Sequence, residues 1–175
     1  PFNHCRHYLP DVPYANPSGP TEATGDCTYY KITRELADNE PIPIGYACEN
    51  TEVLLLDEQG RPVPDGETGE ICGRGVSLAL GYYNNPEKTD QVFVPNPLQK
   101  HYRELVYRTG DLGRVNQYGE ILYVARKDNQ IKHMGHRTEL GEIETAIAAL
   151  EGIRRVCCLY DPARGQTVAR YRGDL

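Results

Sequence analysis

The chain has 175 residues, of which 39% are hydrophobic, with 13 Tyr, 2 Phe and no Trp, so any hydrophobic core is light. A single domain of this length buries about 70% of its unfolded surface, which allows one ordinary domain or two small ones. The net charge of −6 argues against nucleic acid as a partner, and without a run of about 18 apolar residues no membrane partner is expected.

The first part of the chain, up to about Pro43, is rich in Pro, Gly, Asn and Asp. This composition predicts loops and short connections rather than long helices. The apolar segment from Thr51 to Leu56 is followed by turn-forming residues and predicts a buried strand. A second strand is expected near residues 70–72.

Glycines punctuate the next segment, from Gly73 to Tyr83. Glycine at these positions spares the backbone a clash with a Cβ atom. Asn85 as the cap and Pro86 at the first position then predict a short helix that ends near Phe93. A hairpin follows, formed by residues 112–116 and 120–125, with Gly119 at the positive-φ position of its turn.

The last third of the chain contains the clearest helical pattern. Apolar residues fall on one face at helical spacing, and they are Leu140, Ile143, Ile147 and Leu150. Acidic residues load the first turns, where the helix dipole favours anions, and they are Glu139, Glu142 and Glu144. Gly152 can end this helix. Residues 156–160 and 167–171 are expected to form an antiparallel pair on it, and the domain boundary is placed near residues 126–128.

Six cysteines are scattered along the chain without C-x-x-C spacing. This usage is typical of a reduced, cytoplasmic protein. The low apolar content and the start at Pro1 favour a piece of a longer protein, although a Tyr-rich, well-hydrated domain would have the same composition.

Two further segments lack the apolar period of a core-filling segment, namely Tyr107–Leu112 (YRTGDL) and Asp128–Glu144. Together with Gly19–Glu22 (GPTE) and the glycine-rich Gly73–Tyr83, they resemble the adenylate-forming (AMP-binding) superfamily. The resemblance is to its amino acid adenylation domains, of the nonribosomal peptide synthetase and D-alanine carrier protein ligase type. It covers roughly residues 16–150, with four motifs in the family's order.

The resemblance implies an α+β fold in two parts. Residues 1–126 would be the C-terminal portion of the large AMP-binding domain, with a β-rich, distorted barrel-like end. Residues 127–175 would be the first half of the small, mobile α/β lid domain. The family's phosphate loop and its C-terminal catalytic lysine do not occur in these 175 residues, so the chain alone is expected to be inactive.

Adenylation makes a carboxylate attack the α-phosphate of ATP, which depends on positioning, charge neutralisation and a metal. The hydroxyl of Thr21 can hydrogen-bond a phosphate oxygen, and Glu22 offers a hard oxygen ligand for Mg²⁺. These are the family's catalytic roles at these positions, so ATP and Mg²⁺ are the implied cofactors. Where Ser18 stands, the family usually has an aromatic residue that flanks the adenine. Either another side chain stacks on the adenine, or nucleotide affinity is lowered.

Other positions take their roles from the same resemblance. Asp111 would accept hydrogen bonds from both ribose hydroxyls, with Arg126 and Tyr123 near the same sugar. Asp128 matches the hinge about which the small domain swings between two poses. The segment from Lys132 to Arg137 resembles the loop that approaches the pantetheine thiol in the second pose.

The substrate pocket is expected to lie mostly outside these residues, with Pro17, Gly25 and Asp26 at pocket-lining positions. The implied partners are an amino acid, a carrier protein with a phosphopantetheine arm, and the remainder of the same adenylation domain. Two alternatives stay open: a piece of an acyl or aryl coenzyme A ligase, or a noncatalytic domain that binds a nucleotide or a protein.

Overall fold

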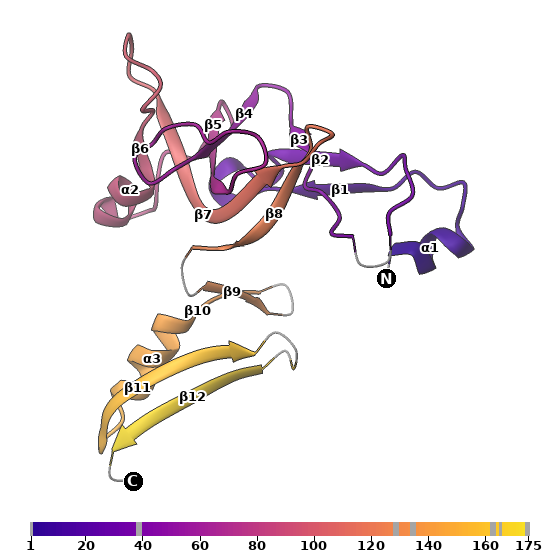
Figure 1. Ribbon diagram of the computed structural model, residues 1–175. Helices are drawn as coiled ribbons and strands as arrows, with labels where there is room; N and C mark the ends of the chain where they lie inside the picture. Colours follow the sequence, from indigo (N-terminus) through magenta and orange to yellow (C-terminus); the bar gives the residue numbers. More distant parts are fainter. Residues whose placement is uncertain are drawn as a thin grey trace. The chain divides into compact units, whose positions relative to one another are not determined.

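The computed structural model describes residues 2–37, 40–127, 130–133, 136–161, 164 and 166–173. The chain divides into two compact units, Pro1–Ala125 and Arg126–Leu175. Figure 1 shows that strands dominate the described residues and that the few helices are short. The predicted β-rich α+β class is confirmed. None of the described helices is long and apolar enough to cross a membrane.

The first unit begins with a short helix and a small antiparallel sheet. Helix α1 (Phe2–Tyr8) is attached to the chain near residue 35 by side chains, because Asn3 and Arg6 donate hydrogen bonds to the carbonyls of Leu36 and Arg34. The sheet has the order β1-β2-β3, with β1 at Ala15–Ser18, β2 at Thr28–Lys31 and β3 at Tyr46–Ala47. The sequence predicts only loops and short connections here, so α1 is a helix that it misses.

A larger sheet follows, with the order β4-β5-β7-β6 and with β8 paired to β7. Its strands are β4 (Thr51–Leu56), β5 (Gly69–Gly75), β6 (Phe93–Pro95), β7 (Leu105–Val115) and β8 (Ile121–Arg126). Its buried side chains form most of the core, and they are Leu56, Ile71, Cys72, Phe93, Val106, Tyr107 and Ile121. The predicted strand at 51–56 is confirmed, and the predicted strand at 70–72 is the middle of the longer β5.

Two local predictions in this unit are also confirmed. Helix α2 (Pro86–Val92) has Asn85 as its cap, whose side chain accepts a hydrogen bond from the Lys88 N–H at 3.0 Å. The hairpin of β7 and β8 turns at Gly119, which has a φ of 76°. Both elements depend on contacts within a few residues, which a sequence pattern can reveal.

The described residues of the second unit form one helix and two antiparallel pairs of strands. Its elements are β9 (Gln130–His133), β10 (His136–Glu139), α3 (Leu140–Ala148), β11 (Ile153–Asp161) and β12 (Gln166–Gly173). Strands β11 and β12 are antiparallel and β11 contacts α3, as predicted. Glu144 on the helix accepts a hydrogen bond from the Cys158 N–H of β11 at 2.7 Å.

The predicted helix is too long at both ends. Glu139 belongs to β10, so it does not load the first helical turn. The helix ends at Ala148, and Leu150 is 58% exposed rather than on the buried face. Its C-terminal turn continues to Gly152, whose φ of 88° is typical of a helix stop.

Candidate functional site

The loop from Gly19 to Gly25 folds back tightly on itself between β1 and β2. The Pro20 carbonyl accepts hydrogen bonds from the N–H groups of Ala23 and Gly25, at 2.9 and 3.2 Å. The Cys27 N–H donates to the carbonyl that precedes Gly19, at 3.0 Å. A Cβ atom on Gly19 would lie 1.8 Å from the Gly25 carbonyl oxygen, so only glycine fits there.

This loop carries Thr21 and Glu22 on a single turn of 3₁₀ helix, η1 (Thr21–Ala23). The side chain of Thr21 is exposed, whereas Glu22 is buried with 8% of its surface accessible. The hydroxyl of Tyr82 donates a hydrogen bond to Glu22 Oε1 at 2.5 Å. The Ala79 N–H donates to the Glu22 carbonyl at 2.8 Å, so the glycine-rich segment fixes both the backbone and the side chain of Glu22.

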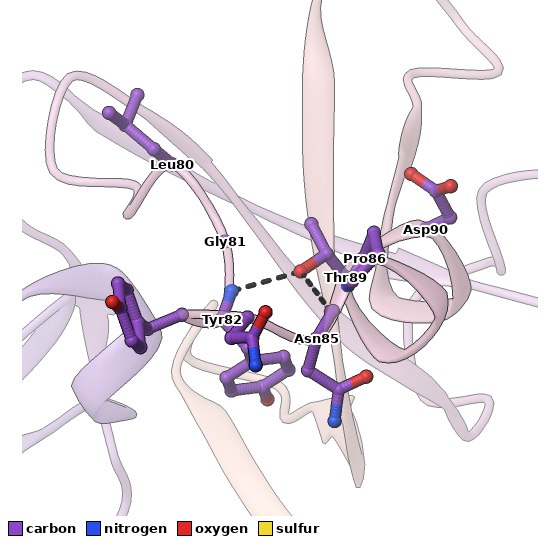
Figure 2. A pocket seen from close by; sticks show the side chains of 9 residues that line it. Leu80, Gly81, Tyr82, Asn85, Pro86, Thr89 and Asp90 are labelled. Atoms are coloured by element: carbon purple, nitrogen blue, oxygen red, sulfur yellow. Dashed lines mark hydrogen bonds between the residues drawn. The ribbon is translucent and has the colours of Figure 1, made fainter.

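Tyr82 is itself held from two sides. Its N–H donates to the hydroxyl of Thr89 at 2.9 Å, and this hydroxyl donates to the Asn85 carbonyl at 2.8 Å (Figure 2). Its ring meets that of Phe93 edge-on, with the centroids 6.0 Å apart, and Phe93 in turn packs on Tyr107. Burial, followed by the hydrogen bond to Glu22, raises the pKa of Tyr82 well above its usual range, so the phenol stays protonated.

A second braced turn carries Asp111 within β7. Glu70 on β5 accepts a hydrogen bond from the Gly110 N–H at 3.1 Å and pairs through its other oxygen with Arg108. The Thr109 hydroxyl accepts from the Asp111 N–H at 2.9 Å and donates to a backbone carbonyl of β5 at 2.7 Å. These bonds fix the backbone at Asp111, whose side chain is half-buried.

The electrostatics of Cys27 connect the two turns. Burial raises the pKa of this thiol, with smaller contributions from Cys48 and from the carboxylates of Asp26 and Asp111. Both carboxylates therefore lie close enough to Cys27 to act on it electrostatically.

The other expected pocket positions border the same loop. Pro17 is exposed on β1, where it pairs with Tyr29 of β2. Gly25 has a φ of 97°, and a Cβ atom there would meet nothing within 4 Å, so this position leaves open space. Asp26 is exposed.

The remaining expected residues are described less fully. Tyr123 lies on β8 and is 48% exposed. Arg126 ends β8 and is counted with the second unit. The expected hinge, Asp128, lies outside the described residues, and so does Gly135 of the 132–137 loop.

The sequence does not reveal that Tyr82 contacts Glu22. The two residues are 60 positions apart, and nothing in the glycine-rich segment indicates which of its side chains turns toward η1. The only signal in the sequence is that Tyr82 belongs to a motif of the resemblance.

The described side chains offer few ligands for a magnesium ion. Among the residues that the structure describes, no group of three or more His, Cys, Asp or Glu side chains is arranged to hold a metal ion. Mg²⁺ usually binds through one or two carboxylates together with substrate phosphates and water. The single fixed carboxylate of Glu22 therefore fits a metal that arrives with a nucleotide.

Comparison with known proteins finds a family match for part of the chain. Residues 5–83 match the model of the AMP-binding enzyme family. This matched segment includes the η1 loop and Tyr82 and ends before Asp111.

Nearly the whole chain is similar to segments of peptide synthetases. The chain is 40% identical over 166 residues to tyrocidine synthase 3 of Brevibacillus parabrevis. This alignment covers 94% of the chain and 2% of the synthase. The chain is 39% identical over 185 residues to gramicidin S synthase 2 of Brevibacillus brevis, covering 98% of this chain and 4% of the synthase. The expected resemblance to adenylation domains of nonribosomal peptide synthetases is confirmed.

Solved structures agree with this assignment. The chain resembles holo-PA1221, described as an NRPS protein containing adenylation and PCP domains and bound to a vinylsulfonamide inhibitor. The TM-score is 0.87 at 32% identity, over 99% of this chain and 30% of that protein. The chain therefore spans less than a third of the solved protein and a few per cent of the two synthases above.

Proposed function

We propose that the protein containing this chain activates an amino acid with ATP and then loads it onto a carrier protein. A carboxylate oxygen of the amino acid attacks the α-phosphorus, and the bond to pyrophosphate breaks. The phosphopantetheine thiol next attacks the carbonyl of the aminoacyl adenylate, and AMP leaves. The observation that carries the proposal is the family match together with the fixed placement of Thr21 and Glu22 on η1.

The exposed hydroxyl of Thr21 would donate to a phosphate oxygen, and the carboxylate of Glu22 would bind Mg²⁺. When bound, this metal would neutralise charge on the phosphates. The Asp111 carboxylate would accept hydrogen bonds from the ribose hydroxyls, with Tyr123 and Arg126 near the same sugar. The braced backbone at Asp111 supports this role, because a fixed carboxylate loses little freedom on binding.

The substrate side of the site would include Pro17, Gly25 and Asp26. The open space at Gly25 and the exposed carboxylate of Asp26 favour a substrate side chain that is polar or cationic.

The two parts of the chain would have different tasks. Residues 1–126 would be the end of the large domain, and residues 127–175 the first half of the small mobile domain, with Asp128 as the hinge between its two poses. The carrier protein would present its thiol near the 132–137 loop in the second pose. The similarity to a protein with adenylation and PCP domains supports a carrier partner, and we place the enzyme in the cytoplasm.

A pair of variants in the full-length protein tests this assignment. Glu22→Gln should lower ATP–pyrophosphate exchange roughly 100-fold, because it removes the charge that holds the metal against the phosphates. Glu67→Gln removes an exposed carboxylate from a turn and should leave exchange unchanged. Equal activity of the two variants would contradict the role of Glu22. Activity that requires coenzyme A and a carboxylic acid would instead support the ligase alternative.

A further inference from the structure

The contact between Tyr82 and Glu22 is not explained by core packing alone. A buried carboxylate is costly unless hydrogen bonds compensate for lost water, and Glu22 is only 8% exposed. The Tyr82 hydroxyl supplies a short bond of 2.5 Å to one of its two oxygens. An O–H donor to a carboxylate at this length is a strong, charge-assisted bond that fixes the rotation of the carboxylate group.

Tyr82 is itself fixed in position, which allows it to orient the Glu22 carboxylate. Its backbone is anchored by the Thr89 hydroxyl, which also bonds to the Asn85 carbonyl at the start of α2 (Figure 2). Its ring rests on Phe93, which is 5% exposed. The neighbouring Tyr83 differs, because its side chain is fully exposed and makes no hydrogen bond within the described part of the chain.

We propose that Tyr82 is a positioning residue for Glu22, which holds the carboxylate so that its charge is presented to the metal–triphosphate complex. This inference rests on the proposed function, since it assumes that Glu22 serves as the metal ligand. The phenol occupies Oε1 and sets the plane of the carboxylate before any nucleotide binds. A ligand oriented in advance loses less freedom on binding, which strengthens the contact without a further charge.

The contact has a second consequence for the metal. Tyr82 is a neutral donor, so it orients Glu22 without cancelling the negative charge as an arginine or lysine would. Tyr82 therefore acts on metal-dependent binding and has no direct effect on ATP alone.

Tyr82→Phe in the full-length protein tests the proposal, with ATP affinity measured by calorimetry both in Mg²⁺ and in EDTA. We expect affinity in Mg²⁺ to fall roughly tenfold, as for loss of one hydrogen bond to a charged group, and affinity in EDTA to stay unchanged. Tyr83→Phe removes an exposed hydroxyl and should change neither value. In a Glu22→Gln background, Tyr82→Phe should have no further effect, because the two residues act as one unit.

Two results would overturn the proposal while leaving the proposed function intact: unchanged affinity of Tyr82→Phe in Mg²⁺, or an equal loss in Mg²⁺ and EDTA, which a merely structural role would give. A wild-type protein that binds no ATP would overturn both. If Tyr82→Phe does not fold, Thr89→Val releases the other side of Tyr82 and should show the same metal-dependent loss. No loss in that variant would also contradict the proposal.

Discussion

Gly19→Ala should destabilise the loop from Gly19 to Gly25 through a direct collision with the backbone. The added Cβ would lie 1.8 Å from the Gly25 carbonyl oxygen and 2.5 Å from the Cys27 nitrogen, and both are backbone atoms. The closer contact must lengthen by at least 1.2 Å to reach 3.0 Å, below which real Cβ contacts are essentially never seen. No side chain can rotate to relieve it.

The displacement would also strain the backbone bonds that close the loop. Two of these hydrogen bonds are donated by the N–H groups of Gly25 and Cys27, the two residues that the added Cβ atom would strike. Overpacking costs about 1–3 kcal/mol and each hydrogen bond contributes about 1 kcal/mol. We therefore expect the free energy of unfolding to fall by about 3 kcal/mol, or a shift of roughly 2 M in the urea midpoint at a slope of about 1.5 kcal/mol per M.

Urea unfolding of the 175-residue chain, followed by far-ultraviolet circular dichroism, measures this change. Gly73→Ala is the matched control, because a Cβ atom there meets nothing within 4 Å, and its effect should stay within about 0.5 kcal/mol. Gly25→Ala adds backbone strain without a collision and should cost about 1 kcal/mol. A urea midpoint of Gly19→Ala equal to that of Gly73→Ala would contradict the predicted collision at Gly19.

Three further predictions concern single contacts. Asp111→Ala in the full-length protein should raise the Kd for ATP roughly 10- to 100-fold in calorimetry without changing the fold, and an unchanged Kd would contradict the ribose role. Asn85→Ala should lower the free energy of unfolding by about 1 kcal/mol in urea, because α2 loses its cap, and a midpoint equal to wild type would count against that bond. Hydrogen bonds from Asn96 and then from Arg74 hold the pKa of Glu104 below its ordinary value. The Glu104 carboxylate therefore stabilises the folded state fully above its ordinary pKa, and this stabilisation is lost as the pH falls through the lowered pKa. Glu104→Gln should accordingly be less stable than wild type at neutral pH and approach it in acid, and a pH-independent difference would argue against this account.

Elements fixed by nearby residues were predictable from the sequence. The cap at Asn85 and the turn at Gly119 each depend on contacts within about four positions, and both are confirmed. Helix α3 was predicted as an element, but its apolar pattern extends to Leu150 although the helix ends at Ala148. Periodicity alone cannot show where a C-terminal turn leaves the helix, because Leu150 fits the pattern and is nevertheless exposed.

Long-range contacts account for what the sequence could not show. The hydrogen bond from Asn3 to the Leu36 carbonyl attaches helix α1 to a distant part of the chain, and the bond from Tyr82 fixes the side chain of Glu22 on η1. Neither pairing leaves a periodic or local signal. Thr21, Glu22 and Asp111 were named through the resemblance, whereas the bonds that brace them come only from the folded chain. Their proposed roles in catalysis stay predictions.

Amino-acid-dependent ATP–pyrophosphate exchange by the full-length protein tests the central claim most directly. It should be screened over the common amino acids and D-alanine, with the 175-residue chain as the control. We expect exchange by the full-length protein with one or a few amino acids, and no exchange by the 175-residue chain alone. Absence of exchange with every amino acid, from a protein that is folded and binds ATP, would contradict it.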